Sequence, residues 1–107
     1  MGITISNLQS LCNSGSIRWT VHMLQRLIQR NISQDEVIEA IQSGEIIEQY
    51  PDDYPHPSCL VLGVTIAGKY LHVVCGRGVE EIWMISAYSP NPVEWETDLK
   101  TRKKVSQ

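Results

Sequence analysis

The sequence contains neither a long apolar run nor a cysteine framework. No stretch approaches the roughly 20 apolar residues of a membrane-spanning helix. The first residues, MGITISNLQS, lack the basic and apolar regions of a secretory signal peptide, so we expect a cytoplasmic protein without membrane association. Its three cysteines, Cys12, Cys59 and Cys75, are odd in number and far apart, which favours reduced thiols over disulfides.

Length and composition predict one compact domain. The chain has 107 residues, of which 42% are hydrophobic and 20% charged, the usual mix of a soluble globular protein. No internal repeat or low-complexity tract interrupts it. We expect a single domain over residues 1–107, with its core at about 18–98 and a basic C-terminal tail over 99–107.

Charge is segregated along the chain, although the net charge is only -3. Residues 1–34 carry three arginines and no acid, whereas residues 35–53 carry seven acids and no base. This pattern predicts one cationic and one anionic surface. For the acidic stretch alone, a solvated helix face is the simpler interpretation.

Two helices are predicted in the first half of the chain. Thr20 is a typical N-cap, and apolar residues then recur with the helical period to about Arg30, where Asn31 ends the helix. A capping box formed by Ser33 and Glu36 opens a second helix, which stops at the next glycine. The short connection requires the two helices to form a hairpin or a sharp angle.

The second half predicts an antiparallel sheet of three to four strands, so the expected fold class is α+β with the two helices packed on that sheet. The proline-rich segment Pro51–Pro57 is expected to be a surface loop. After Tyr88 we expect a short helix around Trp95 or a frayed tail. The predicted strands, each rich in β-branched or aromatic residues, are Glu45–Tyr50, Ser58–Thr65, Lys69–Cys75 and Glu80–Tyr88.

The first helix carries a cationic stripe. His22, Arg26 and Arg30 stand at steps of four and fall within an arc of about 80°. Like charges at this spacing repel, so an anionic partner or solvent must balance them. Three partners are open: acids of this chain, especially Glu45 and Glu48; a phosphate or nucleic-acid backbone; or an acidic protein.

His72 is the second candidate functional residue. In the predicted strand KYLHVVC it is either a half-buried histidine with one satisfied nitrogen or part of a site. Pairing around the GRG turn places Trp83 or Met84 opposite it, and the register decides which face Tyr88 occupies.

Two pairs in the sequence have a spacing that zinc ligands can use, His56-x-x-Cys59 and His72-x-x-Cys75. A strand sends residues three apart to opposite faces, so His72 and Cys75 cannot bind one ion. Cys59, Cys75 and His56 would supply only three of the four ligands of a tetrahedral site. We therefore expect no metal and no other cofactor.

The quoted segments together resemble a known family. The run HMLQRLIQRNISQDEVIEAIQSGEIIEQYPDD, followed by PSCLVLG, LHVVCG and ISAYSPNPVEW, is similar to the domain of unknown function 4258 over roughly residues 20–104. Met23 and Asn31 depart mildly from the family pattern, which often has Ala and Gly there. The resemblance implies a fold like that of the RelE/ParE toxin superfamily, and genes of the family often lie beside small zinc-finger antitoxin-like proteins.

The resemblance favours a toxin-like endoribonuclease that cuts RNA by acid-base attack of the 2′-hydroxyl, acting on free RNA or on the ribosome. His22 or His72 is expected as general acid or base, Arg26 and Arg30 as charge stabilisers, and Tyr88 as the phosphate-orienting group. The alternative is a non-catalytic module whose stripe docks an acidic partner such as an antitoxin segment. The residues expected to attract the nucleic-acid backbone are Arg18, Lys100, Arg102, Lys103 and Lys104.

Overall fold

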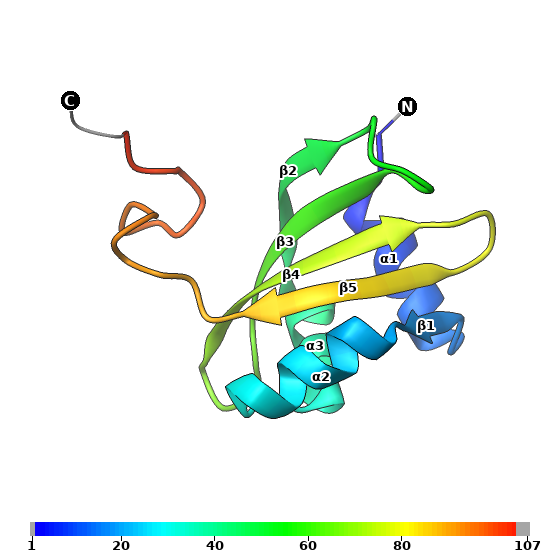
Figure 1. Ribbon diagram of the computed structural model, residues 1–107, viewed down its shortest axis with the longest axis horizontal. Coiled ribbons are helices and arrows are strands. Elements are labelled where there is room, and N and C mark those ends of the chain that lie inside the picture. Colours follow the sequence, from blue (N-terminus) through cyan, green and yellow to red (C-terminus); the bar gives the residue numbers. More distant parts are fainter. Residues whose placement is uncertain (1, 105–107) are drawn as a thin grey trace.

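The structure is a computed structural model that describes residues 2–104, and it has an α+β fold (Figure 1). Three helices surround a five-stranded sheet whose strand order is β1-β5-β4-β3-β2. The helices are α1 (Ile5–Asn13), α2 (Val21–Arg30) and α3 (Gln34–Ser43). The strands are β1 (Ile17–Trp19), β2 (Glu45–Tyr50), β3 (Ser58–Val64), β4 (Tyr70–Arg77) and β5 (Ile82–Tyr88).

The four predicted strands form the antiparallel part of the sheet, β2 to β5, but the prediction of an all-antiparallel sheet with two helices was wrong. β1 adds a fifth strand that runs parallel to β5, and α1 precedes it. β1 has only three residues, too few for a period-two pattern to be visible. The sheet is therefore mixed.

The predicted helix boundaries are confirmed by their caps. The Thr20 side chain accepts from the Met23 amide, and Asn31 ends α2 in the left-handed conformation at φ 55°. Ser33 and Glu36 form the predicted reciprocal capping box at the start of α3. These local interactions fix the sharp connection between α2 and α3.

One face of the sheet packs on α1 and α3 to form the main core. Gly63 on β3 allows close approach of α3, because a Cβ there would lie 1.8 Å from the Ala40 carbonyl oxygen. Leu8 and Cys12 bring α1 into the same cluster. The strand residues of this core include Cys59, Val61, Leu71, Val73, Cys75, Ile82, Met84 and Ala87.

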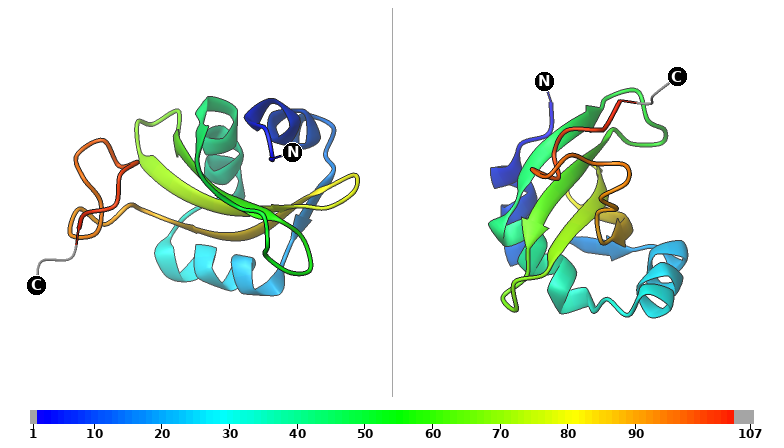
Figure 2. Two further views of the ribbon diagram at one scale, coloured as in Figure 1. Left: turned by 90° about the horizontal axis from the view of Figure 1, so that it is seen from above. Right: turned by 90° about the vertical axis from the view of Figure 1, so that its left-hand side faces the viewer.

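Helix α2 lies along β5, away from α1 and α3 (Figure 2, left). It buries Met23 and Leu27, but much of its apolar surface stays uncovered. Val21 and Ile28 are 71% and 81% exposed, and Leu24 is 37% exposed. We call these three residues the exposed α2 stripe.

Residues 89–104, which we call the C-terminal strap, continue from the end of β5 (Figures 1 and 2) and contact β2 through Lys100 and Arg102. We expected a short helix or a frayed tail here; the segment contains no helix, and an isolated bridge joins Trp95 to Arg102. Trp95 is only 2% exposed, although its neighbours in the strap are exposed. The end of the predicted basic tail, 105–107, lies outside the described residues.

Candidate functional site

The face of the sheet opposite the main core, which we call the second face, carries His72. Because Leu71 and Val73 point into the core, the alternation of β4 turns His72 to the other side. His72 lies opposite Leu62 of β3 and Tyr88 of β5. Tyr88 and His72 therefore share the second face.

The predicted pairing of His72 with Trp83 or Met84 was wrong. Trp83 lies opposite Gly76 and Met84 opposite Cys75. The chain reverses between Arg77 and Ile82 and not at the GRG turn itself, which moves the pairing by several residues. A register shift between Val74 and Cys75 adds one more residue, and a sequence pattern does not reveal such a bulge.

His72 is fully buried beneath the strap. Its Nε2 lies 2.8 Å from the Leu99 carbonyl oxygen, and the Trp95 ring stands edge-on at 4.5 Å between centroids. A carbonyl only accepts, so Nε2 carries the hydrogen and Nδ1 keeps its lone pair. Nδ1 is buried and has no hydrogen-bond partner among residues 2–104. One nitrogen has a partner, as in the first of the two expected alternatives, but the ring is fully buried and not half-buried.

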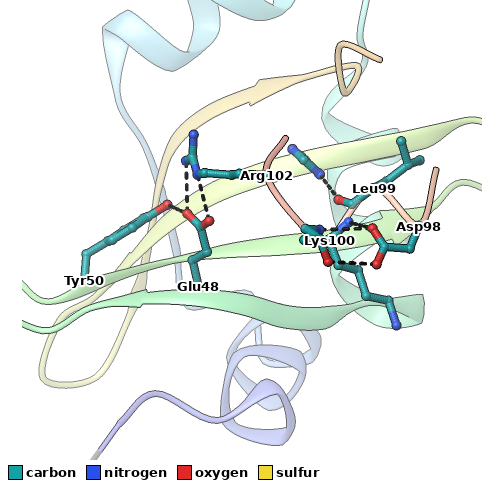
Figure 3. A network of polar contacts seen from close by, with 8 residues as sticks. Glu48, Tyr50, Asp98, Leu99, Lys100 and Arg102 are labelled. Atoms are coloured by element: carbon teal, nitrogen blue, oxygen red, sulfur yellow. Dashed lines mark hydrogen bonds and ion pairs between the residues drawn. The ribbon is translucent and has the colours of Figure 1, made fainter. Parts of the chain in front are cut away.

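Charge pairs hold the strap to β2 (Figure 3). Arg102 donates to both carboxylate oxygens of Glu48 at 2.8 and 3.0 Å, and Tyr50 donates to the same carboxylate. Arg102 thereby lowers the pKa of Glu48, while burial and the Glu48 carboxylate raise the pKa of Tyr50 to about 12. Lys100 pairs with Glu45 at 2.7 Å.

These pairs place the acids that were open as partners of the cationic stripe. Glu45 and Glu48 face the strap and do not balance the stripe of α2. Lys100 and Arg102, which we expect to attract nucleic acid, each pair with one of those two acids. Arg18 likewise pairs with Glu81 at 2.7 Å. Lys103 and Lys104 are exposed.

Arg30 reaches from the end of α2 to the open edge of β5. Its Nη1 donates to the Ala87 carbonyl at 2.8 Å and to Ser86 Oγ at 3.3 Å. Its guanidinium carbon lies 6.0 Å from the Tyr88 ring, whose centroid is 5.4 Å from that of His72. We call this contiguous set the Arg30–Tyr88–His72 row.

The other two predicted catalytic residues lie outside the row. Arg26 bonds Gln29 within α2 at 3.1 Å, and His22 is an exposed residue in the first turn, about 12 Å from Arg30 by helical rise. Around the axis of α2, His22 and Arg26 are rotated to one side of Arg30, which faces β5.

Burial of His72 predicts a pH-dependent stability. Burial lowers the pKa of His72 below its ordinary 6.5, so the unfolded chain binds this proton more readily. Stability is then full above about pH 6.5 and falls as the pH drops below that value. Urea unfolding at pH 7.5 and 5.0 should show this loss in the wild type and in His22→Ala, whose histidine is exposed. His72→Gln should lose less, and equal losses in all three would contradict the assignment.

No group of three or more metal-ligating side chains gathers within residues 2–104. His72 and Cys75 point to opposite faces of the sheet, as their spacing predicted. Cys59 and Cys75 lie in the main core with their sulfurs 3.8 Å apart. Among the described helices, none has the length and apolar character needed to cross a membrane.

A comparison with protein families shows which family the chain belongs to. The model of the family described as "Domain of unknown function (DUF4258)" matches residues 19–89, more than half of the chain. The chain belongs to the DUF4258 family. No curated protein and no solved structure matches it. The DUF4258 match contains the whole Arg30–Tyr88–His72 row, whereas almost all of the strap lies beyond it.

Sequence reasoning named Glu48 and Arg102 but missed that they pair with each other, and it gave Trp95 no part in the site. Glu48, Arg102 and Trp95 were present in the predicted elements, but no local pattern joins residues 54 positions apart. The one available signal was the alternation of sign between the acidic stretch and the basic tail, which the structure resolves into specific pairs.

Proposed function

We propose that the protein is a toxin-like, metal-independent endoribonuclease whose reactive groups are the Arg30–Tyr88–His72 row. The observation that supports it is the convergence of a guanidinium, a phenol and an imidazole from α2, β5 and β4 on one sheet face. These are the groups needed for attack of a 2′-hydroxyl on its own phosphate: a cation, an acid and a base.

Each group has a suitable protonation state near neutral pH. Burial lowers the pKa of His72, which keeps its imidazole neutral and able to accept a proton. Burial raises the pKa of Tyr88, which keeps its hydroxyl protonated and able to donate. Arg30 uses only Nη1 for β5 and Ser86, so its other donors can face a phosphate.

In the proposed reaction, His72 takes the proton of the 2′-hydroxyl and the 2′-oxygen attacks the adjacent phosphorus. Arg30 stabilises the extra negative charge of the phosphorane. The bond from phosphorus to the 5′-oxygen breaks as Tyr88 donates its proton to that oxygen. The products are a 2′,3′-cyclic phosphate and a 5′-hydroxyl end.

The strap must move before RNA reaches this row. The Leu99 carbonyl occupies His72 Nε2 and Trp95 covers the ring. The polar anchors of the strap are surface charge pairs, which contribute little and weaken with salt. We therefore include strap opening as a step of the proposed activity.

Induced expression in a bacterial host tests the proposal. Wild type and His22→Ala should both arrest growth and cleave RNA, because His22 lies outside the row, and Arg102→Ala should do so more strongly because it loses a strap anchor. Normal growth with intact RNA in all three, at confirmed accumulation of folded protein, would contradict the nuclease.

A second candidate is a protein-binding module, favoured by the exposed α2 stripe. Val21, Leu24 and Ile28 form a continuous apolar strip on a helix otherwise rich in polar residues. His22 and Arg26 lie on the opposite side of α2, so a partner bound to the exposed α2 stripe would not contact them. This function predicts a protein complex that the substitution Ile28→Asp abolishes. In the same expression experiment, RNA should stay intact with both the wild type and this variant.

A further inference from the structure

The loop between β2 and β3 encloses an aromatic hollow on the second face. It folds over the start of β5 so that the His56 ring lies 5.5 Å from the Trp83 ring, tilted by 32°. Tyr54 stands at the rim and is 95% exposed. The hollow has a volume of about 340 Å³, within the range of small-ligand sites.

Gly76 lines the hollow opposite Trp83 and contributes no side chain to it. A Cβ at Gly76 would already be in van der Waals contact with the Ile85 side chain at 3.4 Å and with Trp83 Cβ at 3.6 Å. A larger side chain at this position would therefore take up space in the hollow.

One charged residue lines this hollow, and a second lies beside its tryptophan. Asp53 lines it and accepts from Ser58 through Oδ2, which leaves Oδ1 for a ligand donor. The Arg18 guanidinium lies 5.8 Å from the Trp83 ring and its side chain is 62% exposed. Only its Nε pairs with Glu81, so its terminal nitrogens can bind an anion.

A hollow lined by aromatic side chains, with one acceptor in its lining and a cation beside its tryptophan, has the chemistry of a nucleotide site. Aromatic side chains stack on bases of any sequence. A carboxylate selects bases that present N–H donors, and guanine presents the most on one edge. An arginine supplies the phosphate contact.

We propose that this hollow binds a guanine base of a single-stranded RNA, stacked against Trp83 and Tyr54, with its N–H edge on Asp53. The inference rests on the proposed ribonuclease function and names its substrate contact. Trp83 and Tyr88 lie on the same face of β5, roughly 15 Å apart by strand rise. A base held here would direct the following backbone toward Arg30.

Titration with 2′-deoxyguanosine monophosphate tests the pocket without any cleavage, by following indole N–H signals in NMR spectra. Tyr54→Ala should weaken binding about 5- to 150-fold, as expected for the loss of one stacked aromatic. Gly76→Val should abolish it by filling the hollow. Tyr70→Ala, which removes an exposed tyrosine outside the hollow, is the matched control and should bind like wild type.

Base preference gives the second readout. The deoxyadenosine, deoxycytidine and thymidine monophosphates should bind more weakly than the guanine nucleotide, and Asp53→Asn should erase this preference. Equal effects of Tyr54→Ala and Tyr70→Ala, or preferential binding of a proline-rich peptide, overturn the proposal. Binding of the guanine nucleotide without RNA cleavage would support the guanine site and contradict the ribonuclease function. Cleavage without such binding would support the ribonuclease function and contradict the guanine site.

Discussion

Trp95→Ala is expected to release the strap and to raise RNA cleavage about 100-fold or more. Trp95 is the one fully buried side chain of the strap, and it packs on His72 outside the main core. Removing a buried tryptophan side chain costs about 3 kcal/mol or more. If this free energy is lost from strap docking alone, the fraction of molecules with the strap undocked rises by about two orders of magnitude. The fraction in which RNA can reach His72 rises equally.

Hydrogen exchange measures this release independently of activity. The Glu96 amide bonds the Thr101 carbonyl at 2.8 Å and the Lys103 amide bonds the Glu94 carbonyl at 2.9 Å, so both should lose protection. Amides of β4 should keep theirs. Val93→Ala, a change at a 77% exposed strap position, is the control and should alter neither exchange nor cleavage. Loss of β4 protection in Trp95→Ala would show that the strap is inseparable from the core.

The elements with local signals were predictable from the sequence. Capping residues such as Thr20, Asn31 and Ser33 act through neighbours three or four positions away, so their effect is readable in a short window. The four antiparallel strands are similarly marked by composition and by glycine or proline boundaries. By contrast, β1 owes its existence to pairing with β5, more than 60 residues later.

The candidate site was only partly predictable for the same reason. His72, Arg30 and Tyr88 were identified singly, but their contact depends on the β4–β5 register and its bulge. Arg30 was expected to share one role with Arg26, yet only Arg30 reaches the edge of β5. The covering of His72 depends on contacts with Trp95 and Leu99, more than 20 residues away.

Tyr88→Phe should remove catalysis while leaving the fold unchanged. The substitution deletes only the hydroxyl and keeps the ring that contacts His72 and Arg30. Loss of a general acid lowers the rate about 100- to 10,000-fold. The melting temperature should stay that of the wild type. Tyr70→Phe, at an exposed position on the strand that carries His72, serves as the control and should keep full activity.

The most direct measurement is therefore single-turnover cleavage of a labelled single-stranded RNA by purified wild type and Tyr88→Phe, in the wild-type and Trp95→Ala backgrounds. The proposed mechanism predicts products with 2′,3′-cyclic phosphate ends, a faster reaction when the strap is loosened, and a loss of at least about 100-fold in Tyr88→Phe in both backgrounds. Equal rates with and without the Tyr88 hydroxyl, or intact RNA even in the Trp95→Ala background, would contradict a ribonuclease site at the Arg30–Tyr88–His72 row.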